Sequence, residues 1–277
     1  MNNLLKQFIP RPIRSTIRKI YYLILDTSDF LFAQKDELIP PRRKTFVGDG
    51  DFKKIGENFL RYFIELGALK PNDRVLDVGC GIGRMAIPLT KYLNQMGSYE
   101  GFDIIPDEIN WCKENISTKY PNFHFQLADI FNKNYNPKGK LNANGYKFPY
   151  EDESFDFVFL TSVFTHMLPK DVDHYLSEIA RVIKRNKRCL LTFFLLNKES
   201  YKLINIKKSS LNFKYEFGNY KTIDPNIPEI AISYDESFII DLIKKNGLKI
   251  IKPIYYGSWC GREDFLSFQD IIIVSKE

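Results

Sequence analysis

Two periodicities alternate along the chain from about residue 52 onward. Short apolar runs predict strands buried on both faces; they lie at 75–78, 99–103, 122–127, 155–160 and 188–196, with a hairpin-like pair at 248–256 and 268–275. Apolar residues that recur every three or four positions predict amphipathic helices; these lie at about 52–66, 85–93, 106–116, 171–184 and 235–246. Strands and helices that alternate in this way are typical of an α/β fold with a doubly wound sheet.

Three alternating glycines follow the first predicted strand, at Gly79, Gly81 and Gly83, with Cys80 between the first two. Glycine permits positive φ and has no Cβ, so a ligand can lie directly against the backbone. A strand, a glycine loop and a helix in this order open the nucleotide-binding half of a doubly wound sheet. We therefore expect a nucleotide-like ligand at this loop, the alternative being a glycine-rich turn without a ligand.

The spacing of the glycines distinguishes between kinds of ligand. A dinucleotide fingerprint would need a further glycine where Arg84 or Ala86 stands, and the phosphate loop that ends in Gly-Lys-Ser/Thr is absent. Asp103 ends the next predicted strand, about twenty positions beyond the loop. A carboxylate there can accept hydrogen bonds from both ribose hydroxyls of a nucleoside, although Asp103 could also be an ordinary surface charge.

The segment Asp77-Val-Gly-Cys-Gly-Ile-Gly83, together with the acidic strand end, resembles motif I of the class I S-adenosylmethionine-dependent methyltransferases. The resemblance covers about 46–275 and is strongest at 74–103 and 148–168. It implies S-adenosyl-L-methionine as the cofactor. It also implies a Rossmann-like, seven-stranded sheet of order 3-2-1-4-5-7-6, with the last strand antiparallel and helices on both faces.

The resemblance also assigns cofactor-binding positions in this chain. Asp77 would orient the loop or the cofactor's amino group, and the backbone at Gly79 and Gly81 would carry the methionine and ribose portions. In the family an acid after the third strand commonly meets the adenine amino group, and Asp129 has that position, although it could instead cap a turn. The full set is Asp77, Gly79, Cys80, Gly81, Gly83, Asp103, Ile104, Asp129, Ile130 and Thr161.

Two polar segments, at about 131–150 and 198–233, interrupt the family pattern. The first is too long for a routine connection and leaves from the carboxyl end of a strand, so we expect a lid or substrate loop there. A disordered insertion is the alternative. The second segment is expected to cover the acceptor. The residues predicted to contact the acceptor are Tyr135, Tyr146, His166 and Trp259.

The segment after the fourth strand, 161–167, should reach the edge where the methyl group meets its acceptor. Transfer from a sulfonium is an in-line displacement that needs no metal and no covalent intermediate. An alcohol acceptor must also lose a proton, and His166 is the candidate base because its ordinary pKa of about 6.5 suits neutral pH. A structural role for His166 remains open, and an amine or carboxylate acceptor could dispense with a base.

The net charge of +6 is concentrated in the first 44 residues, which contain nine Lys and Arg against four Asp and Glu. Residues 13–25 predict a basic amphipathic helix that can lie on an anionic membrane surface, or pack on the main domain or a second subunit of a homodimer. Its apolar run is too short to span a bilayer. The predicted organisation is an N-terminal arm, 1–45, and a methyltransferase domain, 46–277.

The remaining composition narrows the class of reaction. The four cysteines are widely separated and form neither a disulfide nor a metal-ligand pattern, so we expect a reduced, cytoplasmic setting, or the inner membrane face if the arm binds lipid. The nearly neutral main domain disfavours nucleic-acid methylation. We expect methyl transfer to an oxygen or nitrogen of a small molecule or glycan; the alternatives are a nucleotide-dependent oxidoreductase and a non-catalytic cofactor-binding subunit.

Overall fold

The computed structural model describes residues 38–41 and 51–277, so the predicted basic helix at 13–25 lies outside the described residues. The chain divides into two units, residues 1–55 and 56–277. Every strand among the described residues belongs to the second unit, which is the part described below. Among the described residues no helix is both long and apolar enough to cross a membrane.

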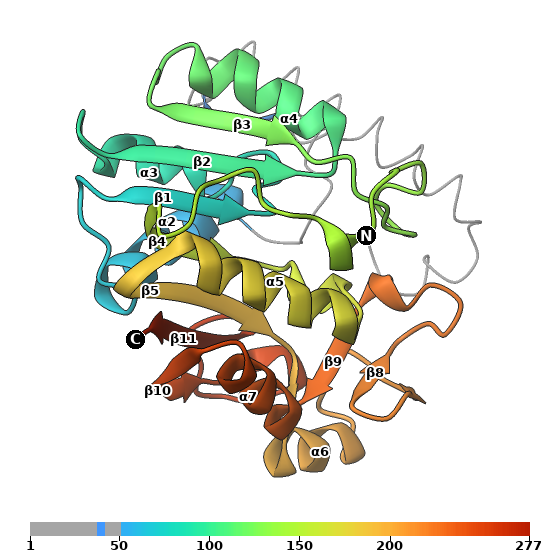
Figure 1. Cartoon of the computed structure of the whole chain (residues 1–277). Coiled ribbons are helices and arrows are strands. Elements are labelled where there is room, and N and C mark those ends of the chain that lie inside the picture. Colours follow the sequence, from blue (N-terminus) through green and yellow to red (C-terminus); the bar gives the residue numbers. More distant parts are fainter. Residues whose placement is uncertain (1–37, 42–50) are drawn as a thin grey trace, which may run out of the picture. The chain divides into compact units, whose positions relative to one another are not determined.

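A seven-stranded sheet forms the centre of the second unit (Figure 1). Its strands are β1 (Arg74–Val78), β2 (Ser98–Asp103), β3 (Phe123–Leu127), β4 (Phe155–Leu160), β5 (Ile183–Phe193), β10 (Leu248–Tyr255) and β11 (Asp270–Lys276). Their order is β3-β2-β1-β4-β5-β11-β10. β11 is antiparallel to both β5 and β10, and the pairs on the β3 side of β5 are parallel. Numbered among themselves these strands run 3-2-1-4-5-7-6, which confirms the predicted topology.

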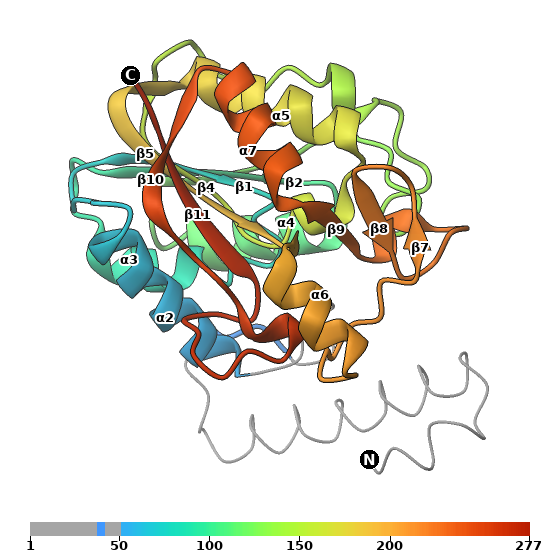
Figure 2. The ribbon, with the colours of Figure 1, turned by 90° about the horizontal axis from the view of Figure 1, so that it is seen from below.

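Helices cover both faces of this sheet (Figure 2). One face carries α5 (Pro169–Val182) and α7 (Glu236–Lys245), and the other carries α2 (Phe52–Glu65), α3 (Ala86–Tyr92) and α4 (Pro106–Cys112). α4 begins with Pro106 and continues through a π-helical turn, Lys113–Ser117. A first-turn proline followed by acidic residues suits a helix start, since the free N–H groups there attract negative charge.

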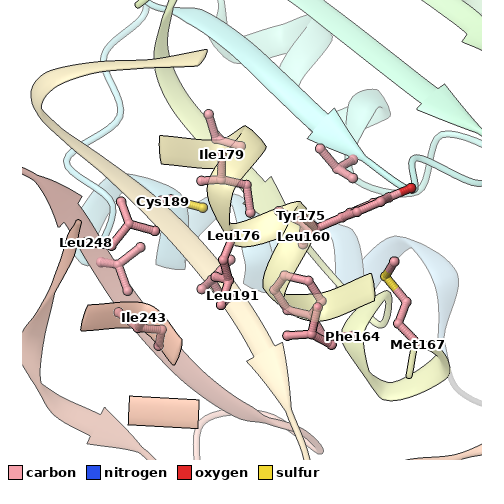
Figure 3. Close-up of a cluster of buried hydrophobic side chains, with 14 of the residues drawn as sticks. Leu160, Phe164, Met167, Tyr175, Leu176, Ile179, Cys189, Leu191, Ile243 and Leu248 are labelled. Carbon is pink, nitrogen blue, oxygen red and sulfur yellow. The ribbon is translucent and has the colours of Figure 1, made fainter. Parts of the chain in front are cut away.

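The main core lies between β4, β5 and the helices α5 and α7 (Figure 3). In α5 the apolar residues Val172, Leu176 and Ile179 recur on one face and are fully buried. They pack with residues of both strands and of α7, including Leu160, Leu191 and Ile243. Burial of each such aliphatic side chain contributes roughly 1.5–3 kcal/mol. The periodicity that predicts the helix is therefore also what attaches it to the sheet.

A second, small sheet occupies the segment predicted as an insertion at 198–233. Its strands are β6 (Leu195–Leu196), β7 (Tyr215–Glu216), β8 (Tyr220–Thr222) and β9 (Ile232–Asp235), in the order β6-β9-β8-β7. The segment also contains α6 (Lys198–Asn205) and a 3-10 turn, Pro228–Ile230. Tyr234 of β9 donates a hydrogen bond to the carbonyl of Met167. This bond ties the small sheet to the segment after β4.

The segment predicted as a lid, 131–150, is held by backbone bridges. Isolated bridges pair Ile130 with Leu141 and Asn132 with Asn136, and a short 3-10 turn follows at Ala143–Gly145. The described connection from β3 to β4 contains no α-helix. An irregular, hydrogen-bonded loop therefore occupies the crossover at which a doubly wound sheet usually carries a helix. Its action as a lid remains a prediction.

Candidate cofactor and acceptor site

The glycine loop is tied to the end of the neighbouring strand β2. The backbone N–H groups of Gly79 and Cys80 both donate to the carbonyl oxygen of Phe102, at 2.9 and 3.1 Å. Gly79, Gly81 and Gly83 have φ of +81°, +51° and +79°, backbone angles that residues other than glycine rarely adopt. The loop therefore turns sharply away from β1 at the carboxyl edge of the sheet.

The three glycines have different surroundings. A Cβ at Gly79 would lie 2.3 Å from Cγ2 of Val163, and one at Gly83 would lie 2.8 Å from Cδ1 of Ile116. A Cβ at Gly81 would meet a single group, Oε2 of Glu108 at 3.2 Å. Glycine is thus needed for packing at the outer two positions. At the central position a Cβ would meet only the carboxyl of Glu108, so the backbone there is the least crowded of the three.

Asp103 joins the glycine loop to β2. Its Oδ2 accepts the N–H of Gly81 at 2.7 Å, and its Oδ1 accepts the N–H groups of Ile104 and Ile105 at 2.6 and 3.1 Å. Burial raises the pKa of Asp103, and these backbone donors oppose that shift by favouring the charged carboxylate. The two motifs that the sequence places twenty residues apart are therefore in direct contact.

Asp77, at the end of β1, is fully buried. Its Oδ2 accepts the Tyr99 hydroxyl at 2.7 Å, whereas its Oδ1 has no hydrogen-bond partner. Burial raises the pKa of Asp77 to about 8, despite the hydrogen bond from Tyr99. Asp77 thus links β1 to β2 through its hydrogen bond with Tyr99, and its Oδ1 remains without a hydrogen-bond partner. Its predicted contact with the cofactor's amino group remains a prediction.

The residues predicted at the adenine end follow β3. The backbone N–H of Ala128 donates to the carbonyl of Asp103 at 2.9 Å, so the ends of β2 and β3 meet. The side chain of Asp129 is about half exposed, with its Oδ2 3.9 Å from Nζ of Lys140, and Ile130 is buried. Asp129 is therefore accessible near Asp103. Ile104 and Thr161, which directly follow β2 and β4, lie at the same edge of the sheet.

His166 faces the lid segment on the other side of this edge. Its Nδ1 lies 2.8 Å from the carbonyl oxygen of Glu229. Because a carbonyl can only accept, Nδ1 carries the hydrogen and Nε2 has the lone pair that accepts the hydroxyl of Tyr135. Nε2 lies 3.4 Å from the hydroxyl of Tyr135, and Asn132 donates to the His166 carbonyl at 3.2 Å. Burial lowers the pKa of His166, so the ring is neutral near pH 7.

A family model described as a methyltransferase domain matches residues 69–215, more than half of the chain. This chain belongs to the class I S-adenosylmethionine-dependent methyltransferase family. The matched residues include the glycine loop, Asp103, the lid segment and His166, so the family assignment and the geometry concern the same part of the molecule.

Curated relatives of this methyltransferase chain cover part of it. The 2-phytyl-1,4-naphtoquinone methyltransferase of Trichormus variabilis is 26% identical over 134 residues, 48% of this chain and 52% of that protein. The demethylmenaquinone methyltransferase of Bacillus cereus is 28% identical over 116 residues, 42% of each chain. The chain thus spans about half the length of the curated relatives it matches.

A solved structure supports the fold over nearly the whole length. Magnesium protoporphyrin IX methyltransferase from Synechocystis, crystallised with bound SAH, covers 95% of this chain and 99% of its own, with 17% identity and a TM-score of 0.52. At that identity the likeness concerns the methyltransferase fold alone.

Two residues predicted to contact the acceptor lie among packed side chains. The prediction for Trp259 is wrong: its side chain is fully buried, packs on Phe194 and Phe213, and donates to Asp270 at 2.8 Å. The folded small sheet and α6 cover a loop that looks exposed in the sequence. Tyr146 is partly buried and packs against the main core beside Phe102, with ring centroids 5.8 Å apart. Contact between Tyr146 and an acceptor remains a prediction.

Sequence reasoning missed Glu108. The residue is in the first turn of α4, where an acid ordinarily interacts with free backbone N–H groups and water. In the fold its side chain is 2% exposed and its Oε1 has no partner. A signal was present in the sequence, because Glu108, Cys112 and Ile116 are spaced four residues apart on the buried face of the helix.

Proposed function

We propose that this protein transfers a methyl group from S-adenosyl-L-methionine to an oxygen or nitrogen of a small-molecule or glycan acceptor. The observation that carries the proposal is the hydrogen bond from Gly81 to Asp103, because it joins a bare backbone turn to a carboxylate that we expect to bind the ribose. When bound, the cofactor supplies an activated methyl group on its sulfonium. The protein's own residues then hold the cofactor, align it with the acceptor and deprotonate an alcohol acceptor.

Holding and alignment fall to the edge formed by β1, β2 and β4. The bare backbone at Gly81 accommodates the ligand, Asp103 accepts ribose hydroxyls, and Asp129 is accessible for the adenine amino group. Two buried carboxyl oxygens without partners, on Asp77 and Glu108, add unused hydrogen-bonding capacity beneath the loop. Correct alignment of the reacting groups can reduce the barrier of such a displacement by roughly 7–11 kcal/mol.

Deprotonation of an alcohol acceptor falls to His166. Its Nδ1–H is engaged by the Glu229 carbonyl, so the lone pair is on Nε2, where an acceptor hydroxyl would replace that of Tyr135. The lowered pKa keeps the ring neutral and able to accept a proton near pH 7. An amine acceptor that binds as the free base would not need this step.

The acceptor class is a small molecule. The curated relatives named above are quinone and menaquinone methyltransferases, which supports an apolar ring compound as the first acceptor to test. The small sheet beside His166 provides cover for such a compound. A lipid-linked acceptor would be presented at the inner membrane face, and the basic segment 13–25 is our proposed contact with that surface.

Calorimetry with S-adenosylmethionine tests the cofactor half of the proposal. The wild-type chain should bind it, Asp103→Ala should bind about tenfold or more weakly because hydrogen bonds to a charged group are lost, and the neighbouring Asp107→Ala should bind like wild type. Binding of a nicotinamide or flavin nucleotide in place of S-adenosylmethionine would overturn the proposal.

Incubation with methyl-labelled cofactor tests the acceptor half. Quinols, their precursors and fractionated cell extract are the substrates to supply, and mass spectrometry should find a product that has gained one labelled methyl group. A protein that binds the cofactor tightly but labels no compound in any fraction would be a non-catalytic binding subunit.

A further inference from the structure

We propose that Glu108 is a second carboxyl group of the cofactor site and hydrogen-bonds a ribose hydroxyl beside Asp103. The inference rests on the proposed function, because it assumes an adenosine-containing ligand at the glycine loop. It adds a residue that neither the motif spacing nor the family resemblance assigns, and it gives that residue a specificity-determining role for the sugar.

The side chain of Glu108 has a hydrogen-bonding group that the protein itself leaves unused. Glu108 is 2% exposed, and Oε1 is buried without a hydrogen-bond partner. Leaving such a group unsatisfied costs about 1–3 kcal/mol, and more when it is charged. A fold that only needed to fill this space would be more stable with an apolar side chain, so the carboxyl points to a ligand that completes it.

The carboxyl also lies directly beside the central glycine of the loop. Apart from its own residue and chain neighbours, a Cβ at Gly81 would meet only Oε2 of Glu108 within 4 Å, at 3.2 Å, so this carboxyl is the group that the backbone of Gly81 faces. The N–H of the same residue is held by Asp103. Both acids therefore flank Gly81, the least crowded of the three glycines in the loop.

The protonation of Glu108 suits a diol. Burial and the neighbouring charge of Asp103 raise the pKa of Glu108 to about 8, and Arg84 only partly opposes this shift. The other titratable groups within electrostatic reach are Cys80, Asp107, Cys112 and Tyr135. A protonated carboxyl donates one hydrogen bond and accepts others. It can therefore satisfy a ribose hydroxyl next to Asp103 without two adjacent negative charges.

The test compares three variants with three ligands. Glu108→Gln keeps a neutral group that can donate and accept, Glu108→Met keeps the length and helix preference without hydrogen bonds, and Glu114→Gln alters an exposed acid in the next turn as the control. The ligands are S-adenosylhomocysteine and its 2′-deoxy and 3′-deoxy analogues. Calorimetry measures the Kd of each pair, and thermal unfolding without ligand measures stability.

We expect Glu108→Met to bind S-adenosylhomocysteine about tenfold or more weakly, with Glu108→Gln and Glu114→Gln near wild type. One deoxy analogue should bind wild type more weakly than S-adenosylhomocysteine does. Glu108→Met should bind that analogue and S-adenosylhomocysteine with similar affinity, because the hydroxyl and the carboxyl are partners. The Met variant should unfold at the same temperature as wild type or higher, since it removes an unsatisfied buried group.

The inference would be overturned if removal of each hydroxyl weakened binding to wild type and to Glu108→Met by the same factor. It would also be overturned if Glu108→Met unfolded at a lower temperature than wild type or failed to fold. Those results would assign Glu108 a structural role. A wild-type chain that binds neither S-adenosylmethionine nor S-adenosylhomocysteine would instead overturn the proposed function itself, so the two failures are distinguishable.

Discussion

His166 has its proton-accepting nitrogen fixed by a single backbone contact. Because Nδ1 donates to the Glu229 carbonyl, the ring cannot present the other tautomer without losing that bond. Burial removes water that would favour the charged ring, so the neutral form persists below its usual pH range. Both effects prepare Nε2 as an acceptor before any substrate arrives.

For an alcohol acceptor, His166→Gln should lower kcat by about 10²–10⁴-fold with little change in cofactor affinity. The acid limb of the wild-type kcat profile should lie below pH 6.5, since the pKa of His166 is lowered. The limb should be absent in the variant. The exposed His124→Gln is the matched control. Full turnover in His166→Gln would reduce His166 to a structural residue.

Asp77 makes the stability of the protein depend on pH. Its pKa is about 8 in the fold, well above the ordinary value of about 3.9, so the folded state binds more protons than the unfolded state between these values. Stability from this group is therefore lost as pH rises toward 8, and Glu108 acts in the same direction.

We predict that the unfolding free energy of wild type falls between pH 6.5 and 8.5 and that Asp77→Asn reduces this fall. The amide still accepts the Tyr99 hydroxyl but does not ionise. Urea titrations at several pH values measure the difference between the two proteins. An identical pH slope in both would show that Asp77 is already ionised in the fold.

At the scale of elements, the loop between β1 and α3 combines packing with ligand access. Gly79 and Gly83 are needed because Val163, which follows β4, and Ile116, which follows α4, approach the backbone, whereas Gly81 faces only the carboxyl of Glu108. The same three-glycine pattern thus serves two physical requirements that the sequence alone does not separate.

Alanine substitutions should separate these requirements. Gly79→Ala should destabilise the fold by about 1–3 kcal/mol, because it adds a clash with Val163 to an unfavourable φ. Gly81→Ala should cost about 1–2 kcal/mol of stability from its φ alone and should weaken cofactor binding. Urea unfolding and calorimetry report the two quantities. Unchanged cofactor affinity in a folded Gly81→Ala variant would contradict ligand contact at this position.

Trp259 belongs to the element that joins β10 to β11 and to a cluster below the small sheet. Its N–H is one of several donors to the buried Asp270, which also receives N–H groups from Leu195 and Gly257. The ring therefore supports the covering segment from beneath and does not reach an acceptor.

Trp259→Ala should destabilise the protein by about 3–5 kcal/mol, since it opens a large cavity and removes a donor from Asp270. Trp259→Phe should lose less stability than Trp259→Ala, because most of the packing remains. Cofactor affinity should be unchanged in any variant that stays folded. A Trp259→Phe variant of normal stability with a raised KM for the acceptor would restore the original prediction.

At the scale of the whole molecule, charge separates the arm from the main domain. Residues 1–44 hold most of the net charge of +6, while the rest of the chain is nearly neutral. Basic residues near an anionic bilayer contribute about 1 kcal/mol each and are screened by salt. Membrane contact, if it occurs, is thus expected to depend on this arm.

Vesicle sedimentation of the full chain tests that expectation. Wild type should co-sediment with vesicles rich in phosphatidylserine at low salt and not with neutral vesicles. Reversal of Arg14, Arg18 and Lys19 to Glu should abolish the binding. Equal binding of wild type and the reversed chain would exclude this segment as the membrane contact.

Local sequence was sufficient for the frame and its main site. The alternation of strand and helix, the glycines after β1 and the acid that ends β2 are short-range patterns, and each is enforced by backbone sterics or by one neighbouring strand. Parallel strands bring their carboxyl ends to one edge, so Asp103 and the glycine loop could be expected to meet before any coordinates were known.

Only the tertiary structure decided which side chains are covered. Glu108 looks like a helix-start acid and Trp259 like a loop aromatic, yet both are buried by segments distant in sequence. The small sheet that covers the region of Trp259 pairs Leu195 of β6 with Tyr234 of β9, which lie far apart in the sequence, and no local periodicity encodes such pairing. Burial is a property of the assembled fold, because it depends on which surfaces meet, and so the spacing of Glu108 with Cys112 did not by itself show that the carboxyl of Glu108 is enclosed.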